Sequence, residues 1–265
     1  MKRRWLLGLL AVSAFAPSLA LAQAEPAAIY SEMDRVHPVF ARHGMVASQE
    51  ETATRTALEV LKNGGNAVDA TVTAAFTLAV TLPRAGNLGG GGFMIVHDAK
   101  GDETVAIDYR EKASVRAFRD MFLDAKGEAD PEKSRYSGLA VGVPGTVAGM
   151  ALALERYGTI SLADALAPAI ELAEDGITVS ADLADSLKAS AKRLQKWPSS
   201  AEIFLKDGGA PYEEGDVLIQ KDLARSLRLI AEEGPDAFYR GPIAGQIVAE
   251  VERTGGNLTL DDLKG

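Results

Sequence analysis

The chain has 265 residues, of which 47% are hydrophobic and 25% charged, with 26 Gly, 11 Pro, no Cys and a formal net charge of −9. This composition is that of a globular protein, so it excludes a collagen-like repeat, an intrinsically disordered chain and a disulfide-rich miniprotein. Without cysteine, a thiolate-bound zinc or iron–sulfur site is excluded as well.

The first 22 residues have the pattern of a secretory signal peptide. Lys2, Arg3 and Arg4 precede an apolar run over residues 5–15, and small residues at 20–22 offer a cleavage site. The apolar run is too short to span a bilayer comfortably, so the sequence predicts export to the periplasm or the medium without a stable membrane span. Loss of the three basic residues takes the net charge from −9 to −12, which disfavours nucleic acid as a partner.

Two helices are predicted after residues 23–41, which we expect to form a mobile leader. Ser48 and Glu51 have the spacing of a capping box for the first helix, and Gly64 offers a left-handed cap at its end. Asn66 caps the second helix, whose residues 67–80 are nearly all apolar or Thr. We therefore expect the second helix to be buried on almost every side.

A glycine-rich loop over residues 86–92 is predicted to lead into a β-hairpin. Its strands cover residues 93–97 and 104–109, joined by a turn at 98–101, and Arg110 follows the second strand. The first strand begins with a continuous apolar run instead of an alternating pattern, so we expect both of its faces to be covered.

The rest of the chain is predicted to be mainly helical. One helix begins near Pro144, and a second is capped by Ser161 and kinked or interrupted by Pro168. Further helices are expected at about 182–194, 223–233 and 242–253. Thr259 and Asp262 cap a last helix with room for one turn, and because one turn is not stable alone, we expect this chain to be the front part of a longer polypeptide.

Most familiar catalytic signatures are absent from the sequence. There is no G-x-S-x-G, S-x-x-K, H-E-x-x-H or phosphate-binding P-loop. His37, His43 and His97 are the only histidines and are too scattered to predict a metal site. The glycines at 89–92 precede a strand and not a helix, so close backbone packing is favoured over phosphate binding.

Arg110 is the strongest candidate for a binding residue. A guanidinium at the exit of a strand can hold a carboxylate through two parallel hydrogen bonds, which lysine cannot do. Asp108 and Glu111 flank it, so the residues by themselves favour a structural salt bridge over substrate binding.

Several stretches together resemble the gamma-glutamyltransferase family of the N-terminal-nucleophile hydrolases, from about His37 to the last residue. Each motif is weak alone, but all occur in the order and approximate spacing of the family. They are His37-Pro38, Gly44-Met45-Val46-Ala47-Ser48, residues 62–70 (KNGGNAVDA), residues 87–94 (NLGGGGFM), Asp108-Tyr109-Arg110-Glu111, residues 143–146 (VPGT) and residues 238–242 (FYRGP). Ser114, where proline is expected, and Leu88, where a smaller or branched residue is commoner, depart from the pattern.

The resemblance implies a proenzyme that cleaves itself into a larger and a smaller chain. A threonine at the start of the smaller chain would be the nucleophile, with its own α-amino group as base and with no cofactor or metal. This threonine would lie beyond Gly265, because residues 42–265 would be part of the large subunit. A gamma-glutamyl group would pass from glutathione or a related donor to water, an amino acid or a peptide. Arg110 would hold the α-carboxylate of the donor.

The implied fold is α/β, an αββα sandwich of which this chain supplies an incomplete, helix-rich portion. Two alternatives remain open at this point. Relatives on the same scaffold act on β-lactam side chains or on poly-gamma-glutamate, and the residues that separate them lie mostly outside this chain. A periplasmic protein that binds acidic amino acids without catalysis would use Arg110 in the same way.

Overall fold

The structure is a computed structural model that describes residues 39–207 and 209–265. The chain divides into two units, residues 1–41 and 42–265, and the second is described here. The predicted signal peptide and most of the predicted leader lie outside the described residues. The elements in chain order are α1 (Glu51–Lys62), α2 (Ala67–Thr81), β1 (Phe93–Asp98), β2 (Glu103–Asp108), α3 (Pro131–Tyr136), η1 (Gly138–Ala140), α4 (Thr146–Tyr157), α5 (Leu162–Asp175), β3 (Ile177–Thr178), α6 (Ala181–Leu194), α7 (Pro198–Phe204), β4 (Val217–Leu218), α8 (Lys221–Glu233), α9 (Asp236–Tyr239), α10 (Pro242–Arg253) and α11 (Leu260–Lys264).

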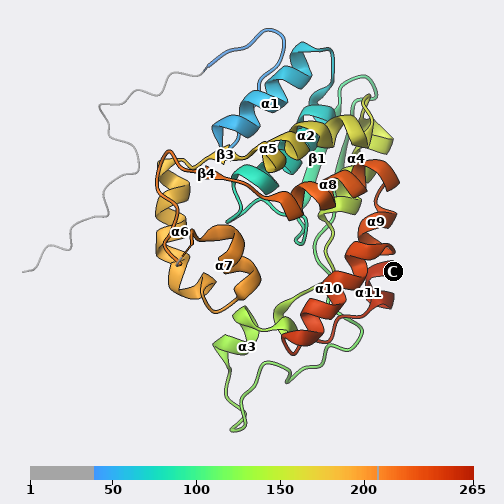
Figure 1. Ribbon diagram of the computed structural model, residues 1–265. Coiled ribbons are helices and arrows are strands. Elements are labelled where there is room, and N and C mark those ends of the chain that lie inside the picture. Colours follow the sequence, from blue (N-terminus) through green and yellow to red (C-terminus); the bar gives the residue numbers. More distant parts are fainter. Residues whose placement is uncertain (1–38, 208) are drawn as a thin grey trace, which may run out of the picture. The chain divides into compact units, whose positions relative to one another are not determined.

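Helix α2 lies at the centre of a helical layer, in contact with α1, α4 and α5, while α5 also packs against α8 (Figure 1). As predicted, α2 is buried on almost every side, with 11 of its 15 residues buried. The hydroxyls of Thr73 and Thr77 donate to the backbone carbonyls four residues earlier, so their burial leaves no polar group without a partner. Phe76, Val80, Met150, Leu166 and Leu227 are among the fully buried side chains of the core.

Local hydrogen bonds at the helix ends confirm most of the predicted caps. Asn66, Ser161 and Thr259 each form a capping box with the aspartate three residues later. The prediction for α1 was wrong, because the cap is Glu50, whose carboxylate accepts from two backbone N–H groups of the first turn. The hydroxyl of Ser48 instead donates to the Glu50 carbonyl.

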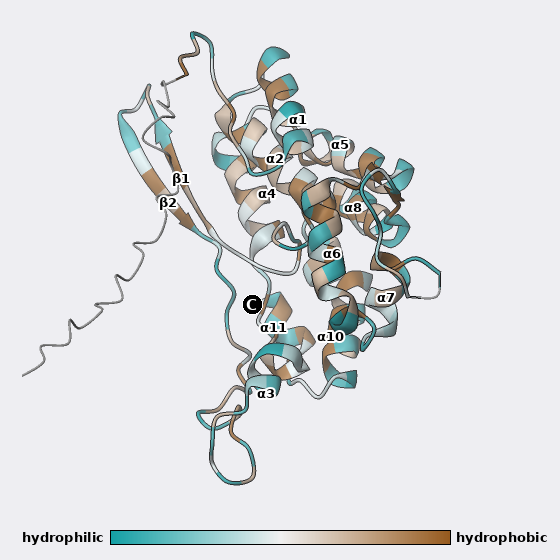
Figure 2. Ribbon diagram, turned by 90° about the vertical axis from the view of Figure 1, so that its left-hand side faces the viewer, coloured by the Kyte–Doolittle hydropathy of each residue, from teal (hydrophilic) through white to brown (hydrophobic). Residues whose placement is uncertain are grey.

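The predicted hairpin is present as an antiparallel pair of β1 and β2, in which Phe93 lies opposite Asp108. Met94 and Ile107 are buried in the main core. The prediction that both faces of β1 are covered was wrong within the described residues, because Phe93 and Ile95 are 66% and 76% exposed. Only one face of the hairpin packs on the helices, and Figure 2 shows apolar colouring along β1 beside them.

Helix α5 runs across Pro168, so of the two predicted outcomes, a kink or an interruption, the interruption does not occur. Beyond it, β3 and β4 form a second two-stranded antiparallel sheet, and α6 and α7 follow β3 in the chain. The described part of the chain is thus helix-rich with two small sheets. None of its helices is both long enough and apolar enough to cross a bilayer.

Candidate functional site

Backbone pairing holds the segment around Arg110 on both sides. Before it, the N–H of Tyr109 donates to the carbonyl of Gly92 at 3.0 Å, which continues the β1–β2 ladder. After it, the N–H of Val143 donates to the carbonyl of Lys112 at 2.7 Å, in an isolated antiparallel bridge. Arg110 therefore has a fixed backbone position although it lies outside regular secondary structure.

The glycine loop packs directly against this segment. A Cβ on Gly91 would lie 2.9 Å from the Cα of Arg110, so no larger residue fits without displacement. The carbonyl of Gly90 accepts from the N–H of Thr146 at 3.0 Å, at the start of α4. The side-chain oxygen of Asn87 accepts from the N–H of Gly90 and from the hydroxyl of Thr146, at 2.8 and 2.9 Å. The interpretation of the glycines as close backbone packing is confirmed.

The side chain of Arg110 is 59% exposed and forms one ion pair, from Nε to the Glu111 carboxylate at 3.4 Å. Asp108 does not pair with the guanidinium but accepts from the backbone N–H of Arg110 at 3.0 Å. Among residues 39–207 and 209–265, neither terminal guanidinium nitrogen has a hydrogen-bond partner. The predicted salt bridge is thus formed with Glu111, and both terminal guanidinium nitrogens stay open to a ligand.

Arg110 lies at the edge of a pocket of about 340 Å³ between the end of β2, the start of α4 and helices α9 and α11. The charged residues that line it are the cations Arg110, Lys112, Arg240 and Lys264 and the carboxylates Asp108 and Asp236. Cations outnumber carboxylates, while the whole chain has a net charge of −9. The pocket is therefore suited to a small anionic ligand.

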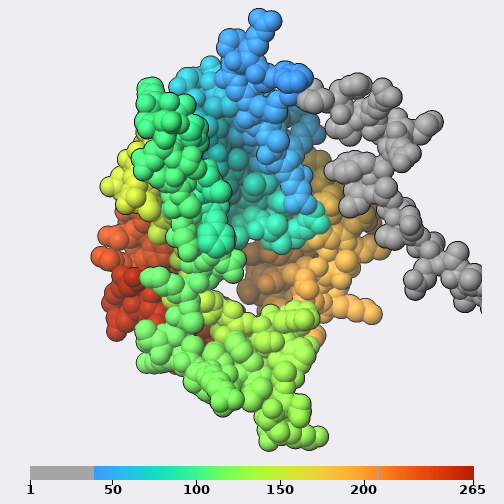
Figure 3. All heavy atoms as spheres, turned by 180° about the vertical axis from the view of Figure 1, so that it is seen from behind, coloured from blue at the N-terminus to red at the C-terminus, as the bar shows by residue number. Residues whose placement is uncertain are grey.

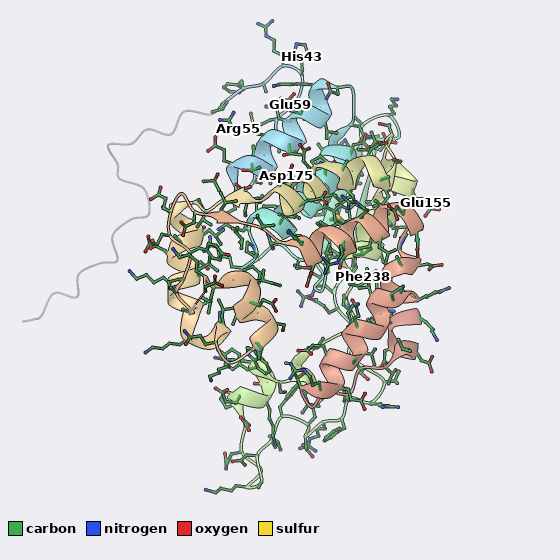
Figure 4. The ribbon with its side chains drawn as sticks, viewed as in Figure 1. His43, Arg55, Glu59, Glu155, Asp175 and Phe238 are labelled. Carbon is green, nitrogen blue, oxygen red and sulfur yellow. The ribbon has the colours of Figure 1, made fainter. Side chains whose placement is uncertain are left out.

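Tyr239 forms part of the pocket wall and braces α4. Its hydroxyl donates to the carbonyl of Pro144 at 2.9 Å and accepts from the N–H of Ala148 at 3.1 Å. Burial raises the pKa of Tyr239, and the hydrogen bond from Ala148 offsets part of that rise. The neutral phenol is thus the form that holds the start of α4 beside Arg110. Its neighbour Phe238, labelled in Figure 4, is buried in the core.

Tyr239, Arg240 and Lys264 were not predicted to have a role in a site. The only signal for the first two was their place in the motif at residues 238–242. Their position beside Arg110 depends on packing of α9 and α11 against the chain more than 100 residues earlier, which no local pattern encodes.

The histidines do not gather into a site. His43, labelled in Figure 4, is exposed on the segment that precedes α1. His97 is exposed on β1, with Nδ1 3.0 Å from the Thr104 hydroxyl, and His37 lies outside the described residues. Among the residues that the structure describes, no group of three or more His, Asp or Glu side chains is arranged to hold a metal ion.

Comparison with known proteins links this geometry to one family. The family model described as gamma-glutamyltranspeptidase matches residues 53–265. The chain is 49% identical over 264 residues to the glutathione hydrolase proenzyme of Escherichia coli K12, covering 99% of this chain and 45% of that protein. It is 41% identical to the corresponding proenzyme of Bacillus subtilis 168, covering 45% of that protein. The chain thus spans about half the length of the curated relatives it matches.

A solved structure agrees with the sequence comparison. The gamma-glutamyltranspeptidase of Helicobacter pylori superimposes with a TM-score of 0.83 at 44% identity, covering 86% of this chain and 65% of that one. The matched family region contains the hairpin, the glycine loop, Arg110 and the pocket around it. On the strength of the sequence match and the shared fold, the chain belongs to the gamma-glutamyltranspeptidase family.

Proposed function

We propose that the whole protein moves a gamma-glutamyl group from glutathione or a related donor to water, an amino acid or a peptide. Membership of an enzyme family supports this reaction, and so do relatives named glutathione hydrolase proenzymes. In this proposal the nucleophile is a threonine outside the present chain, exposed when the precursor cleaves itself into two subunits. The threonine oxygen takes the gamma-glutamyl acyl group, the amine leaves with a proton, and water or an acceptor amine then takes the acyl group.

The contribution of this chain is to bind the donor. Arg110 would hold the α-carboxylate through the two guanidinium nitrogens that no described residue occupies, while Glu111 keeps the Nε side engaged. Binding of the α-carboxylate would fix the distance between Arg110 and the gamma-carbonyl of the donor. A nucleophile on the other subunit needs a carbonyl held in one place in this way. The observation that carries the proposal is the position of Arg110 at the edge of a cationic pocket. Its backbone is held by hydrogen bonds on both sides, and its guanidinium is open.

The proposed complete fold is the αββα sandwich of N-terminal-nucleophile hydrolases. The exposed apolar side chains of Phe93 and Ile95 support it, because large apolar side chains on the outer face of a hairpin are suited to packing against a second sheet. Residues 42–265 would then be part of the large subunit. Residues 1–22 would be a signal peptide for export to the periplasm or the medium, followed by the leader at 23–41.

The test is donor kinetics in the complete precursor with Arg110→Ala and Arg110→Lys. We expect self-cleavage to proceed, and the KM for glutathione to rise by at least 10-fold in both variants, since lysine cannot replace a bidentate contact worth about 1.5–3 kcal/mol. Arg119→Lys is the matched control, because Arg119 is almost fully exposed and does not line the pocket. A KM unchanged by Arg110→Ala would remove Arg110 from the donor site.

Two other functions predict different results. A cephalosporin acylase from Bacillus halodurans superimposes with a TM-score of 0.71 at 28% identity, so an acylase acting on β-lactam side chains shares the scaffold. If the protein were such an acylase, it would turn over a cephalosporin in place of gamma-glutamyl donors. A non-catalytic binder would bind glutathione tightly with the present chain alone, which isothermal titration measures directly.

A further inference from the structure

A second hollow lies away from the Arg110 pocket, between α3 and the junction of α6 and α7. It has a volume of about 500 Å³. Its lining includes the cations Lys133, Arg193 and Lys196 and the aromatic residues Tyr136 and Trp197. Figure 3 shows the two contributing segments, yellow-green and orange, side by side on this face of the molecule.

The charge of this hollow is opposite to that of the chain. It is lined by three cations and one carboxylate, Glu132, whereas the chain as a whole has a net charge of −9. Within the described ranges, none of the three cations forms an ion pair with a carboxylate. Arg193 lies in the last turn of α6 and Lys133 in the last turn of α3, positions that the helix dipole favours, and the ammonium of Lys133 donates to the Leu123 carbonyl at 2.5 Å. Lys196 lies beyond α6 and still lines the same space.

Two aromatic residues line the hollow, Tyr136 at the end of α3 and Trp197 just before α7. The guanidinium of Arg193 lies over the ring of Tyr136, 6.0 Å from its centroid, which joins α6 to α3 through a cation–π contact. Trp197 is half-buried at the cap position of α7, and its backbone N–H donates to the carbonyl of Leu194 at 3.0 Å. Pro198 follows and restricts the backbone at Trp197.

We propose that this hollow binds a small aromatic carboxylate. The ring would pack against Tyr136 and Trp197, and the carboxylate would accept hydrogen bonds from Lys196 and Arg193. A volume of about 500 Å³ is within the usual range for small-molecule sites. The hollow shares no lining residue with the Arg110 pocket, so this inference does not depend on the proposed function.

Trp197 provides a reporter at the site itself. In the complete protein, the signal of Trp197 is the difference in fluorescence between the Trp5→Phe variant and the Trp5→Phe/Trp197→Phe double variant; Trp5, the other tryptophan of the given sequence, lies in the predicted signal peptide. Titration with phenylacetate is expected to change this difference with saturation. Phenylacetamide, which has the same ring and no charge, is expected to bind at least 10-fold more weakly, and added salt is expected to weaken phenylacetate binding.

Charge removal at the hollow separates specific binding from binding elsewhere. In the Trp5→Phe background, Lys196→Gln is expected to weaken phenylacetate binding at least 5-fold, whereas Lys100→Gln, the same charge change in the hairpin turn, is expected to leave it unchanged. Lys196 is exposed, so the variant is expected to fold, which circular dichroism checks. Absence of a saturable signal, equal affinity for acid and amide, or an affinity unchanged by Lys196→Gln would overturn the proposal.

Discussion

Replacement of Asp262 by asparagine is expected to destabilise the fold in a pH-dependent way. The carboxylate is 8% exposed and accepts from the N–H of Val115 at 2.8 Å and from the hydroxyls of Thr259 and Ser114 at 2.7 and 2.9 Å. It therefore links the first turn of α11 to the segment that follows the Arg110 motif. An asparagine side chain keeps one oxygen acceptor and presents an NH₂ group to these donors, so at least one contact is lost.

The pKa of Asp262 gives the size of its contribution to stability and the direction in which that contribution changes with pH. Burial alone would raise the pKa of Asp262, but the hydrogen bonds outweigh it and lower the pKa from 3.8 to about 2. This shift corresponds to about 2 kcal/mol of folding free energy. Because the folded pKa is below the unfolded one, the contribution is complete above about pH 4 and is lost as the pH falls toward 2.

Urea unfolding followed by circular dichroism measures this contribution. At pH 7, Asp262→Asn is expected to lower the free energy of unfolding by about 2 kcal/mol, and the difference from wild type should shrink between pH 4 and pH 3. Asp261→Asn is the matched control, because it removes the same charge from the same turn, and the side chain of Asp261 is 91% exposed. A difference that stays constant from pH 7 to pH 3, or equals that of the control, would refute the assigned role of the carboxylate.

Other substitutions test the packing behind the site. Asp69→Ala, which leaves N–H groups before α5 without their acceptor, is expected to cost about 3 kcal/mol in urea unfolding, against less than about 0.5 kcal/mol for the exposed Asp175→Ala. Gly91→Ala would place a Cβ 2.4 Å from the Tyr109 carbonyl and is expected to lower the free energy of unfolding by about 2 kcal/mol. Pro168→Ala restores an N–H inside α5 and is expected to raise the free energy of unfolding by about 1–2 kcal/mol. A decrease in that free energy would indicate that the proline ring contributes essential packing.

The features that sequence predicted correctly depend on residues close together in the chain. The boxes at Asn66, Ser161 and Thr259 need only a partner three residues away, and the physics of a helix N-terminus is the same in any fold. The box predicted at Ser48 fails for the same local reason, because Glu50 is better placed to accept from the first turn. The hairpin was predicted because its apolar strands flank a turn sequence.

The features that sequence missed depend on distant partners. Strands β3 and β4 have two residues each, too few for a periodic pattern, and exist only because they pair with each other. Ser114 was noted only as a departure from the family pattern, yet its hydroxyl contacts Asp262, 148 residues later. The exposure of Phe93 depends on what lies against the hairpin, which an apolar run does not specify.

A separate set of contacts between distant segments fixes the backbone around Arg110 while its guanidinium stays open. Gly92 pairs with Tyr109 before it, Val143 pairs with Lys112 after it, and Gly91 packs against its Cα. A flexible arginine would lose conformational entropy each time it ordered around a carboxylate, and that loss would weaken binding. Because the backbone is ordered in advance, only the side chain has to settle, and selectivity for an α-carboxylate can come from the geometry of the guanidinium alone.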